Sequence, residues 1–299
     1  MINNEIKCNS LRAWVLAARP KTLSGASVPV MIGIALSWAD LGCEGFKVVP
    51  AVLCMLFAFV MQIDANFVND YFDYVSGKDD DQRLGPPRAC AMGWIGAGKM
   101  RLGILLTTVV ACLVGLPLVL YGGIEMIAVG AVCVVFCFLY TTFMASRGLG
   151  DLLVLVFFGL VPVCLTYYLQ AATVTGPVVA ASLACGLVID TLLVVNNYRD
   201  IDNDRRAGKN TLIVKVGARA GIQTYLSLGV VACLIGVVFL LSGYPFAFAM
   251  PVVYLLLHIK TYKKMKRIGK GRDLNIVLAD TARNMFVYGL AVAFGLIVG

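Results

Sequence analysis

The most constraining feature of this sequence is a succession of long apolar stretches, each long enough to cross a lipid bilayer. A spanning helix needs about 20 mostly apolar residues, and nine such stretches follow one another along the chain. They cover 22–40, 48–69, 102–120, 123–141, 150–170, 177–198, 221–241, 245–262 and 280–298. Because unpaired backbone groups are not tolerated in lipid, all nine are expected to be helical. The predicted fold is an all-α polytopic membrane protein, with residues 1–299 forming one domain.

The composition argues against the main alternatives. Apolar and aromatic residues make up 60% of the chain and charged residues only 14%, against roughly 45–50% and about 25% in soluble domains. A soluble enzyme and a disordered protein are therefore disfavoured. The net charge of +8 would suggest nucleic acid in a soluble protein, but in a membrane protein basic residues mark the cytoplasmic side. No nucleic-acid partner is needed to explain it.

The segments between the stretches alternate in character. Short uncharged segments occupy 121–122, 171–176 and 242–244, whereas long charged segments occupy 70–101, 199–220 and 263–279. Nine spans place the N-terminus and the long segments on one side of the membrane, and the positive-inside rule makes that side the cytoplasm. The C-terminus is then expected on the opposite side, and any catalytic site is expected at the cytoplasmic face.

Two clusters of acidic and amide side chains lie where the second and sixth stretches end. The first contains Gln62, Asn66, Asn69, Asp70 and Asp73, with Asp79 in the loop that follows; the second contains Asp190, Asn197, Asp200 and Asp204. On a continuous helix each cluster, Asp79 aside, covers an arc of about 100° or less. Asp64 points to the opposite side of the second stretch. Two matching polar faces therefore reach the same membrane surface.

Crowded carboxylates repel one another unless cations neutralise them. Hard oxygen ligands suit Mg²⁺, which binds through a few carboxylates and commonly bridges them to phosphate groups. A single acidic run is also typical of a solvated helix end, but two matched runs on separate spans favour a metal site. Basic residues follow each cluster, with Arg88 after the first and Lys209 after the second. Divalent metal together with Arg and Lys is what recognition of a diphosphate requires.

With these motifs the sequence resembles the UbiA superfamily of intramembrane prenyltransferases. The resemblance rests on the order and spacing of Ala18–Leu23 (ARPKTL), Asn66–Asp73 (NFVNDYFD), Arg83–Arg88 (RLGPPR), Gly148–Asp151 (GLGD), Asn196–Asp204 (NNYRDIDND) and Gly208–Leu212 (GKNTL). It runs from about residue 12 to the C-terminus. The resemblance implies nine helices around a central cavity that opens toward the cytoplasm, with both acidic motifs facing that cavity.

The resemblance also implies roles for individual residues. Two Mg²⁺ ions would be held by Asp70, Asp73, Asp79, Asp200 and Asp204. Asn66, Asn69 and Asn197 would support them, and Lys21, Arg88, Arg147 and Lys209 would neutralise the diphosphate. With Lys209, the four carboxylates other than Asp79 form the expected catalytic set. Ionisation of the diphosphate gives an allylic cation, which aromatic faces such as those of Tyr140 and Tyr198 can stabilise.

The implied donor is a long polyprenyl diphosphate whose tail stays among membrane lipid. Asp79 follows Asp73 by six residues, whereas Gly77 stands where the broader superfamily more often has its later Asp. This spacing favours the branch that acts on 1,4-dihydroxy-2-naphthoate, with loss of CO₂ and diphosphate. Acceptors such as 4-hydroxybenzoate, homogentisate or protohaem remain alternatives within the family. The implied location is the bacterial cytoplasmic (inner) membrane.

Several residues keep two interpretations. Lys21 could bind the acceptor carboxylate instead of the diphosphate, and tyrosines at helix ends are also ordinary interface anchors. Asp151 could be a helix-terminal acid favoured by the helix dipole or a group that supports the site. For Asp64 and Asp190 the default is helix–helix hydrogen bonding, and His258 is expected at the membrane interface.

A function of another class also deserves comparison. Acidic residues inside spans can relay protons or bind cations in secondary transporters. A transporter would more naturally have broken helices at mid-membrane and charges deep in several spans, whereas Asp64 and Asp190 are the only deep acids in this sequence. A structural scaffold would give no reason for two matched acidic faces. Prenyl transfer is therefore the favoured interpretation.

Overall fold

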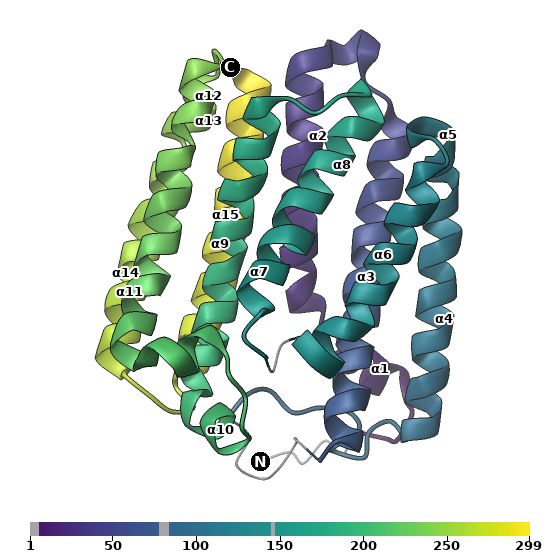
Figure 1. Ribbon diagram of the computed structural model, residues 1–299, viewed down its shortest axis with the longest axis vertical. Helices are drawn as coiled ribbons and strands as arrows, with labels where there is room; N and C mark the ends of the chain where they lie inside the picture. The colour runs from purple at the N-terminus through teal and green to yellow at the C-terminus, as the bar shows by residue number, and fades with distance from the viewer. Residues whose placement is uncertain (1–5, 78–83, 145–146) are drawn as a thin grey trace.

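The computed structural model describes residues 6–77, 84–144 and 147–299. Within these ranges it contains nine apolar helical segments long enough to cross a membrane and no β-strand. The segments stand side by side as an upright bundle (Figure 1). The predicted all-α polytopic fold is confirmed.

Several of the nine spans are built from more than one helical element. In chain order the elements are α1 (Leu11–Ala18), η1 (Pro20–Thr22), α2 (Leu23–Gly45), α3 (Val48–Val75), α4 (Ala97–Gly115), η2 (Leu116–Leu118), α5 (Val119–Gly122), α6 (Glu125–Leu139), η3 (Tyr140–Met144), α7 (Gly150–Val154), η5 (Leu155–Leu160), α8 (Val161–Ala171), α9 (Gly176–Arg199), α10 (Ile201–Arg206), α11 (Leu212–Ile235), α12 (Val237–Leu241), α13 (Pro245–Ala249), α14 (Val252–Ile268) and α15 (Leu274–Val298). The first span joins α1, η1 and α2, and the fifth joins α7, η5 and α8.

The helices extend beyond the apolar stretches that predict them. The second span continues to Val75 and the seventh begins at Leu212, whereas the apolar stretches there cover 48–69 and 221–241. Helical backbone bonds still form where the sequence turns polar, so hydropathy alone underestimates the length of these helices. At the start of the seventh span, the side chain of Thr211 accepts a hydrogen bond from the Val214 N–H and caps the helix.

The centre of the bundle is α9, which packs against α11, α15 and η5. Close approach of α9 to η5 depends on two facing glycines. A Cβ on Gly159 would lie 2.8 Å from the Cα of Gly186, which is closer than real side chains pack. Small residues are expected where membrane helices meet, and this contact confirms the expectation for both positions. Gly130, in contrast, faces open space.

His258 is fully buried in α14, so its predicted position at the membrane interface is wrong. The helix continues ten residues further, to Ile268, and the imidazole packs against a neighbouring helix. Its Nε2 lies 3.0 Å from the carbonyl oxygen of Tyr225, and a Cβ on Gly229 would be only 2.4 Å from that nitrogen. The missing side chain of Gly229 therefore makes room for the ring.

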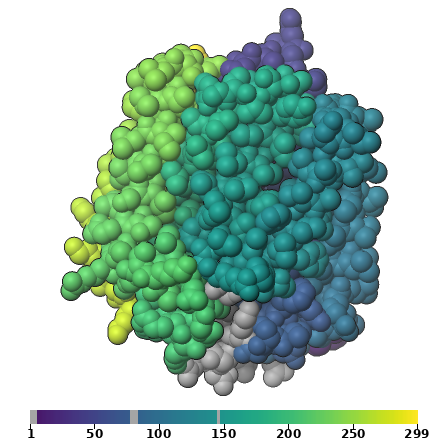
Figure 2. All heavy atoms as spheres, in the orientation of Figure 1, coloured from purple at the N-terminus to yellow at the C-terminus, as the bar shows by residue number. Residues whose placement is uncertain are grey.

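The two ends of the bundle differ. Helices α1 and α10 lie at one end, and α12, α13 and the C-terminus lie at the other (Figure 1). Figure 2 shows the same face in spheres, with the segment from α6 to α8 at its centre. Large apolar side chains such as Leu105 and Leu113 of α4 are exposed on the outer surface, as expected of a surface in contact with lipid. Both acidic motifs lie at the α1 and α10 end.

Candidate active site

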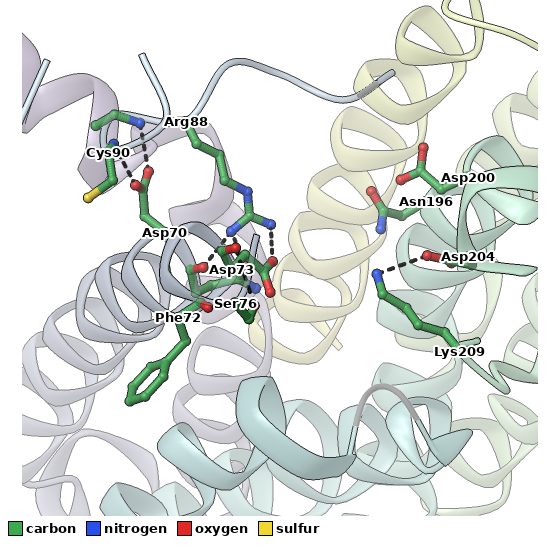
Figure 3. Close-up of polar contacts among 12 residues, drawn as sticks. Asp70, Phe72, Asp73, Ser76, Arg88, Cys90, Asn196, Asp200, Asp204 and Lys209 are labelled. Carbon is green, nitrogen blue, oxygen red and sulfur yellow. Dashed lines mark hydrogen bonds and ion pairs between the residues drawn. The ribbon is translucent and has the colours of Figure 1, made fainter. Parts of the chain in front are cut away.

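A cavity of about 940 Å³ lies inside the bundle, bounded by α2, α3, α4 and the helices from α6 to α9. Its deeper walls are largely apolar and include the rings of Phe57, Phe136 and Phe157. Its polar wall residues come mainly from the ends of α3 and α9 and from the loops beside them. Figure 3 shows the two acidic motifs facing each other. An apolar chamber with a polar mouth is typical of a site for an amphipathic ligand.

On one side of the mouth, Asp73 and Arg88 form an ion pair with Arg88 Nη2 2.6 Å from Asp73 Oδ2. The same guanidinium hydrogen-bonds both the backbone and the side-chain oxygen of Asn69. All three residues line the cavity. Arg88 is only 6% exposed, and these oxygens hold its guanidinium in place. Its positive charge is therefore directed into the mouth.

Asp70 has a different position from its neighbours in the motif. It is fully buried and is not part of the cavity wall. Its two carboxylate oxygens accept hydrogen bonds of 2.8 Å from the backbone N–H groups of Ala89 and Cys90. Asp70 therefore anchors the loop that carries Arg88, and the predicted single polar face of the second span is divided between cavity and loop.

Asn66 connects the second span to the first. Its amide nitrogen donates to the carbonyl oxygen of Ala18 and to the hydroxyl of Thr22, both at 2.9 Å. Between these two residues, Arg19 takes a left-handed backbone conformation with φ 50°, and Pro20 follows it. The turn brings Arg19 to the cavity wall, with Nη2 4.0 Å from Asp70 Oδ2.

On the other side of the mouth, Arg199 holds Asp200 in place. Arg199 is 4% exposed, and its Nε and Nη2 atoms donate to the two Asp200 oxygens at 2.9 and 2.6 Å. The helix breaks at Asp200, between α9 and α10, so the acidic face predicted for one continuous helix is bent. Asn197, Asp200 and Asp204 nevertheless all line the cavity.

Asp204 pairs with Lys209, whose Nζ lies 2.9 Å from Oδ1. Burial raises the pKa of Asp204 above its ordinary value, and the neighbouring ammonium opposes that shift. Lys209 also lines the cavity. Each acidic motif therefore presents a carboxylate together with a cation at the mouth.

A short chain of hydrogen bonds connects the two motifs. Arg199 Nη1 donates to the side-chain oxygen of Asn275, at the start of α15, at 2.8 Å. The amide nitrogen of Asn275 in turn donates to the carbonyl oxygen of Leu84 at 2.8 Å. Leu84 begins the described part of the loop that leads to Arg88. The loops of the two motifs are thus joined to one another through α15.

Not every predicted site residue reaches the cavity. Lys21 is exposed and is not part of the wall, and the Arg147 guanidinium lies over the Phe143 ring, 3.5 Å from its centroid. Tyr198 is buried and donates its hydroxyl to the Gly269 carbonyl at 2.6 Å, whereas Tyr140 does line the cavity. Asp79 lies outside the described residues.

Several wall residues were missed by sequence reasoning. Arg19 and Arg199 lie inside quoted motifs, but nothing in their spacing distinguishes them from topology signals. Phe136 and Phe157 face each other with ring centroids 4.8 Å apart, and in the sequence they are ordinary apolar residues of a span. Asp64 turns away from the cavity and accepts hydrogen bonds from two threonines of α4, as the helix–helix default predicts.

The donor atoms at the mouth suit magnesium in kind. Carboxylate oxygens of Asp73, Asp200 and Asp204 and amide oxygens of Asn69 and Asn197 are the hard ligands that Mg²⁺ prefers. Among the described residues, no three acidic, His or Cys side chains are already gathered as a metal site. Mg²⁺ usually binds through one or two carboxylates plus phosphate oxygens. The donor set therefore fits a metal that arrives with a phosphate ligand.

Fold and site together define a class: a polytopic helical membrane protein with an apolar cavity and a mouth of paired carboxylates and cations. The chain belongs to the UbiA prenyltransferase family, which matches residues 26–290. This confirms the resemblance that the motifs indicate.

Relatives and solved structures agree with this membership. The 1,4-dihydroxy-2-naphthoate octaprenyltransferase of Mycobacterium tuberculosis is 35% identical over 296 residues, covering 97% of this chain and 98% of the relative. The Haemophilus influenzae enzyme of the same name is 35% identical over 269 residues, covering 85% of each chain. A UbiA homolog from Aeropyrum pernix K1 has the same fold, with TM-score 0.70 at 14% identity over 92% of this chain and 97% of that one. A UbiA homolog from Archaeoglobus fulgidus, bound to GPP and Mg²⁺, has TM-score 0.63 at 14% identity over 96% of this chain and all of that one.

Proposed function

We propose that this protein transfers a polyprenyl group from a long-chain polyprenyl diphosphate to 1,4-dihydroxy-2-naphthoate. Diphosphate and CO₂ leave, and the product is demethylmenaquinone, an intermediate of menaquinone biosynthesis. The observation that carries the proposal is the pairing of a carboxylate and cation mouth with an apolar cavity of about 940 Å³. The names of relatives 35% identical over most of the chain support the naphthoate acceptor.

The residues of the mouth have distinct tasks in this reaction. Arg88 and Lys209 hold the negative charge of the diphosphate, which grows on the leaving group as the carbon–oxygen bond breaks. Asp70 and Asn66 position the residues that bind the diphosphate. Asp70 holds the loop after α3, and Asn66 holds the turn at Arg19. The apolar walls receive the isoprenoid tail, and Tyr140, which lines the cavity, stabilises the allylic cation through its ring.

Magnesium completes the proposed site. Asp73, Asp200 and Asp204 are the carboxylates that would hold it, with Asn69 and Asn197 beside them and two ions as the proposed number. When bound, Mg²⁺ offsets the phosphate charge that the protein cations leave uncompensated. The Mg²⁺-bound homolog from Archaeoglobus fulgidus supports this proposal at the level of the family.

The chain spans a membrane, and we propose that it lies in the bacterial inner membrane with the mouth toward the cytoplasm. Basic residues favour that orientation under the positive-inside rule. The tail of the donor then remains in lipid while its diphosphate meets the aqueous side. An N-terminus in the cytoplasm and a C-terminus outside follow from the odd number of spans.

The test is prenyl transfer in membranes that contain the protein. Polyprenyl diphosphate is supplied with dihydroxynaphthoate, with 4-hydroxybenzoate or with no acceptor, each with Mg²⁺ or with EDTA. We expect a prenylated, decarboxylated product from dihydroxynaphthoate only when Mg²⁺ is present. Transfer to hydroxybenzoate alone would overturn the acceptor, and transfer that survives EDTA would overturn the metal. Cation-driven uptake without prenyl transfer would favour a transporter instead.

A further inference from the structure

Two acidic side chains in the wall of the bundle each have one buried oxygen without a hydrogen-bond partner in the described part of the chain. Asp151, near the start of α7, and Asp190, in the middle of α9, each have a buried Oδ1 atom without a partner among the described residues. Asp190 is only 5% exposed. A buried polar atom without a hydrogen-bond partner destabilises a folded protein. Two such atoms at one place indicate that a hydrogen-bond donor from outside the chain belongs there.

The two acids share one location beside Tyr140. Helix α7 packs against both α9 and η3, the element that begins with Tyr140. Electrostatic coupling of Asp190 to Asp151, and of Tyr140 to both acids, agrees with this packing. Tyr140 and Asp151 line the cavity, as do Ile189 and Leu193 on either side of Asp190. Three polar groups from three elements therefore converge in an otherwise apolar part of the wall.

Asp64 shows that this arrangement is not a general feature of buried acids in this bundle. It is fully buried in α3, and its two oxygens accept hydrogen bonds from the hydroxyls of Thr107 and Thr108. Its hydrogen-bonding needs are met within the protein and it is not part of the cavity wall. At Asp151 and Asp190 one buried oxygen of each carboxyl group lacks such a donor among the described residues, and both residues adjoin the cavity.

We propose that Asp151 and Asp190, beside Tyr140, bind a phenolic hydroxyl of the aromatic acceptor. The inference rests on the proposed function and names the part of the cavity that recognises its second substrate. Carboxyl oxygens accept hydrogen bonds, so they recognise a hydroxyl group. The acceptor's own carboxylate is drawn instead toward the cations of the mouth, Arg88 and Lys209. The ring is thereby oriented with a hydroxyl at the wall and its carboxylate at the polar end.

The experiment combines variants of Asp190 with acceptors that lack one hydroxyl. The acceptors are 1,4-dihydroxy-2-naphthoate, 1-hydroxy-2-naphthoate and 4-hydroxy-2-naphthoate, and the proteins are wild type, Asp190→Leu and Asp190→Asn. Loss of a hydroxyl weakens the nucleophilicity of the ring equally in every protein, so that effect cancels in the comparison. What remains is the interaction between the hydroxyl and the side chain.

Removal of one of the two hydroxyls from the acceptor should lower kcat/KM in both wild type and Asp190→Leu. We expect the loss in wild type to be about 10- to 100-fold larger than the loss in Asp190→Leu, which is the range typical of a hydrogen bond to a charged group. Asp190→Asn, whose amide oxygen still accepts a hydrogen bond, should retain part of that difference. The KM for polyprenyl diphosphate should stay within about twofold, because the diphosphate binds at the mouth. Asp151→Asn should reduce the difference between acceptors in part, as Asp190→Asn does, which keeps the test open if Asp190→Leu folds poorly.

Asp64→Asn is the matched control, because it alters a buried acid whose partners are both threonines. In Asp64→Asn, the loss of kcat/KM on removal of a hydroxyl from the acceptor should equal the loss in wild type. Equal losses from both hydroxyl deletions in wild type and in all the Asp190 and Asp151 variants would overturn the proposal and would mean that these acids bind only structural water. If no naphthoate acceptor is prenylated by the wild type, the proposed function itself fails, and that result is distinct from a failure of this inference.

Discussion

Asp70 Oδ1 accepts a hydrogen bond of 2.8 Å from the backbone N–H of Cys90, twenty residues further along the chain. With the matching bond from Ala89, it fixes the loop that directs Arg88 toward Asp73. Within one acidic motif, the two aspartates therefore have separate tasks. Asp73 faces the cavity, and Asp70 holds the loop from inside the protein.

Substitution of these two aspartates should separate the tasks. Asp73→Asn is expected to reduce prenyl transfer strongly while leaving thermal stability near that of wild type. Asp70→Asn, in contrast, places an amide NH₂ group against the backbone N–H donors of the loop, which costs about 1–3 kcal/mol of folding free energy. This variant should therefore lower both the activity and the unfolding temperature in detergent. Equal unfolding temperatures for the two variants would contradict the loop-anchoring role of Asp70.

Arg199 provides a second prediction. Its guanidinium makes two bonds to Asp200, one to Asn196 and one to Asn275, a fork that a lysine ammonium cannot reproduce. Arg199→Lys should lower kcat/KM by at least about tenfold, because the ammonium keeps the charge but cannot hold both Asp200 oxygens in the same geometry. Arg205→Lys is the control, because Arg205 is exposed and lies 3.9 Å from Asp202. It should stay within about twofold of wild type.

Sequence predicts the spans well because length and hydropathy are properties of single segments. Among the described residues, eight of the nine predicted stretches lie within observed spans, and the stretch 123–141 begins two residues before its span, Glu125–Met144. The sequence also correctly predicts that Asn197, Asp200 and Asp204 face one cavity, although the helix bends at Asp200. It could not separate Asp70 from Asp73, because a helical projection does not contain the loop that Asp70 binds. Likewise the burial of His258 depends on the space beside Gly229, which belongs to another helix.

Metal removal tests the oxygen donors of the mouth. EDTA should abolish prenyl transfer, and added Mg²⁺ should restore it. In Asp200→Asn and Asp204→Asn, where one charged ligand becomes neutral, restoration should need at least about tenfold more Mg²⁺, in line with the dependence of affinity on ligand charge. The measurement is a Mg²⁺ titration of the initial rate. Restoration at the same Mg²⁺ concentration in all three proteins would argue against these carboxylates as ligands.

Helix packing can be tested at Gly186. A Cβ there would lie 2.8 Å from Leu155 Cδ1 and 3.1 Å from the Leu155 carbonyl oxygen. Gly186→Val should destabilise the protein by about 1–3 kcal/mol, the usual range for overpacking. Gly130→Ala, at a position with open space, should not destabilise it. Thermal unfolding of both variants in detergent gives the comparison, and an unchanged transition for Gly186→Val would be inconsistent with this contact between η5 and α9.

The last prediction concerns two lysines that sequence treats alike. Lys209 lines the cavity and pairs with Asp204, whereas Lys21 is exposed and away from the wall. Lys209→Met removes a cation from the diphosphate and leaves Asp204 without its partner, so the KM for polyprenyl diphosphate should rise by at least about tenfold. Lys21→Met should change that KM by less than about threefold, because an exposed charge is screened by solvent. Initial rates over a range of donor concentrations separate the two, and the reverse order would mean that the diphosphate binds outside the mouth defined by Asp73 and Asp204.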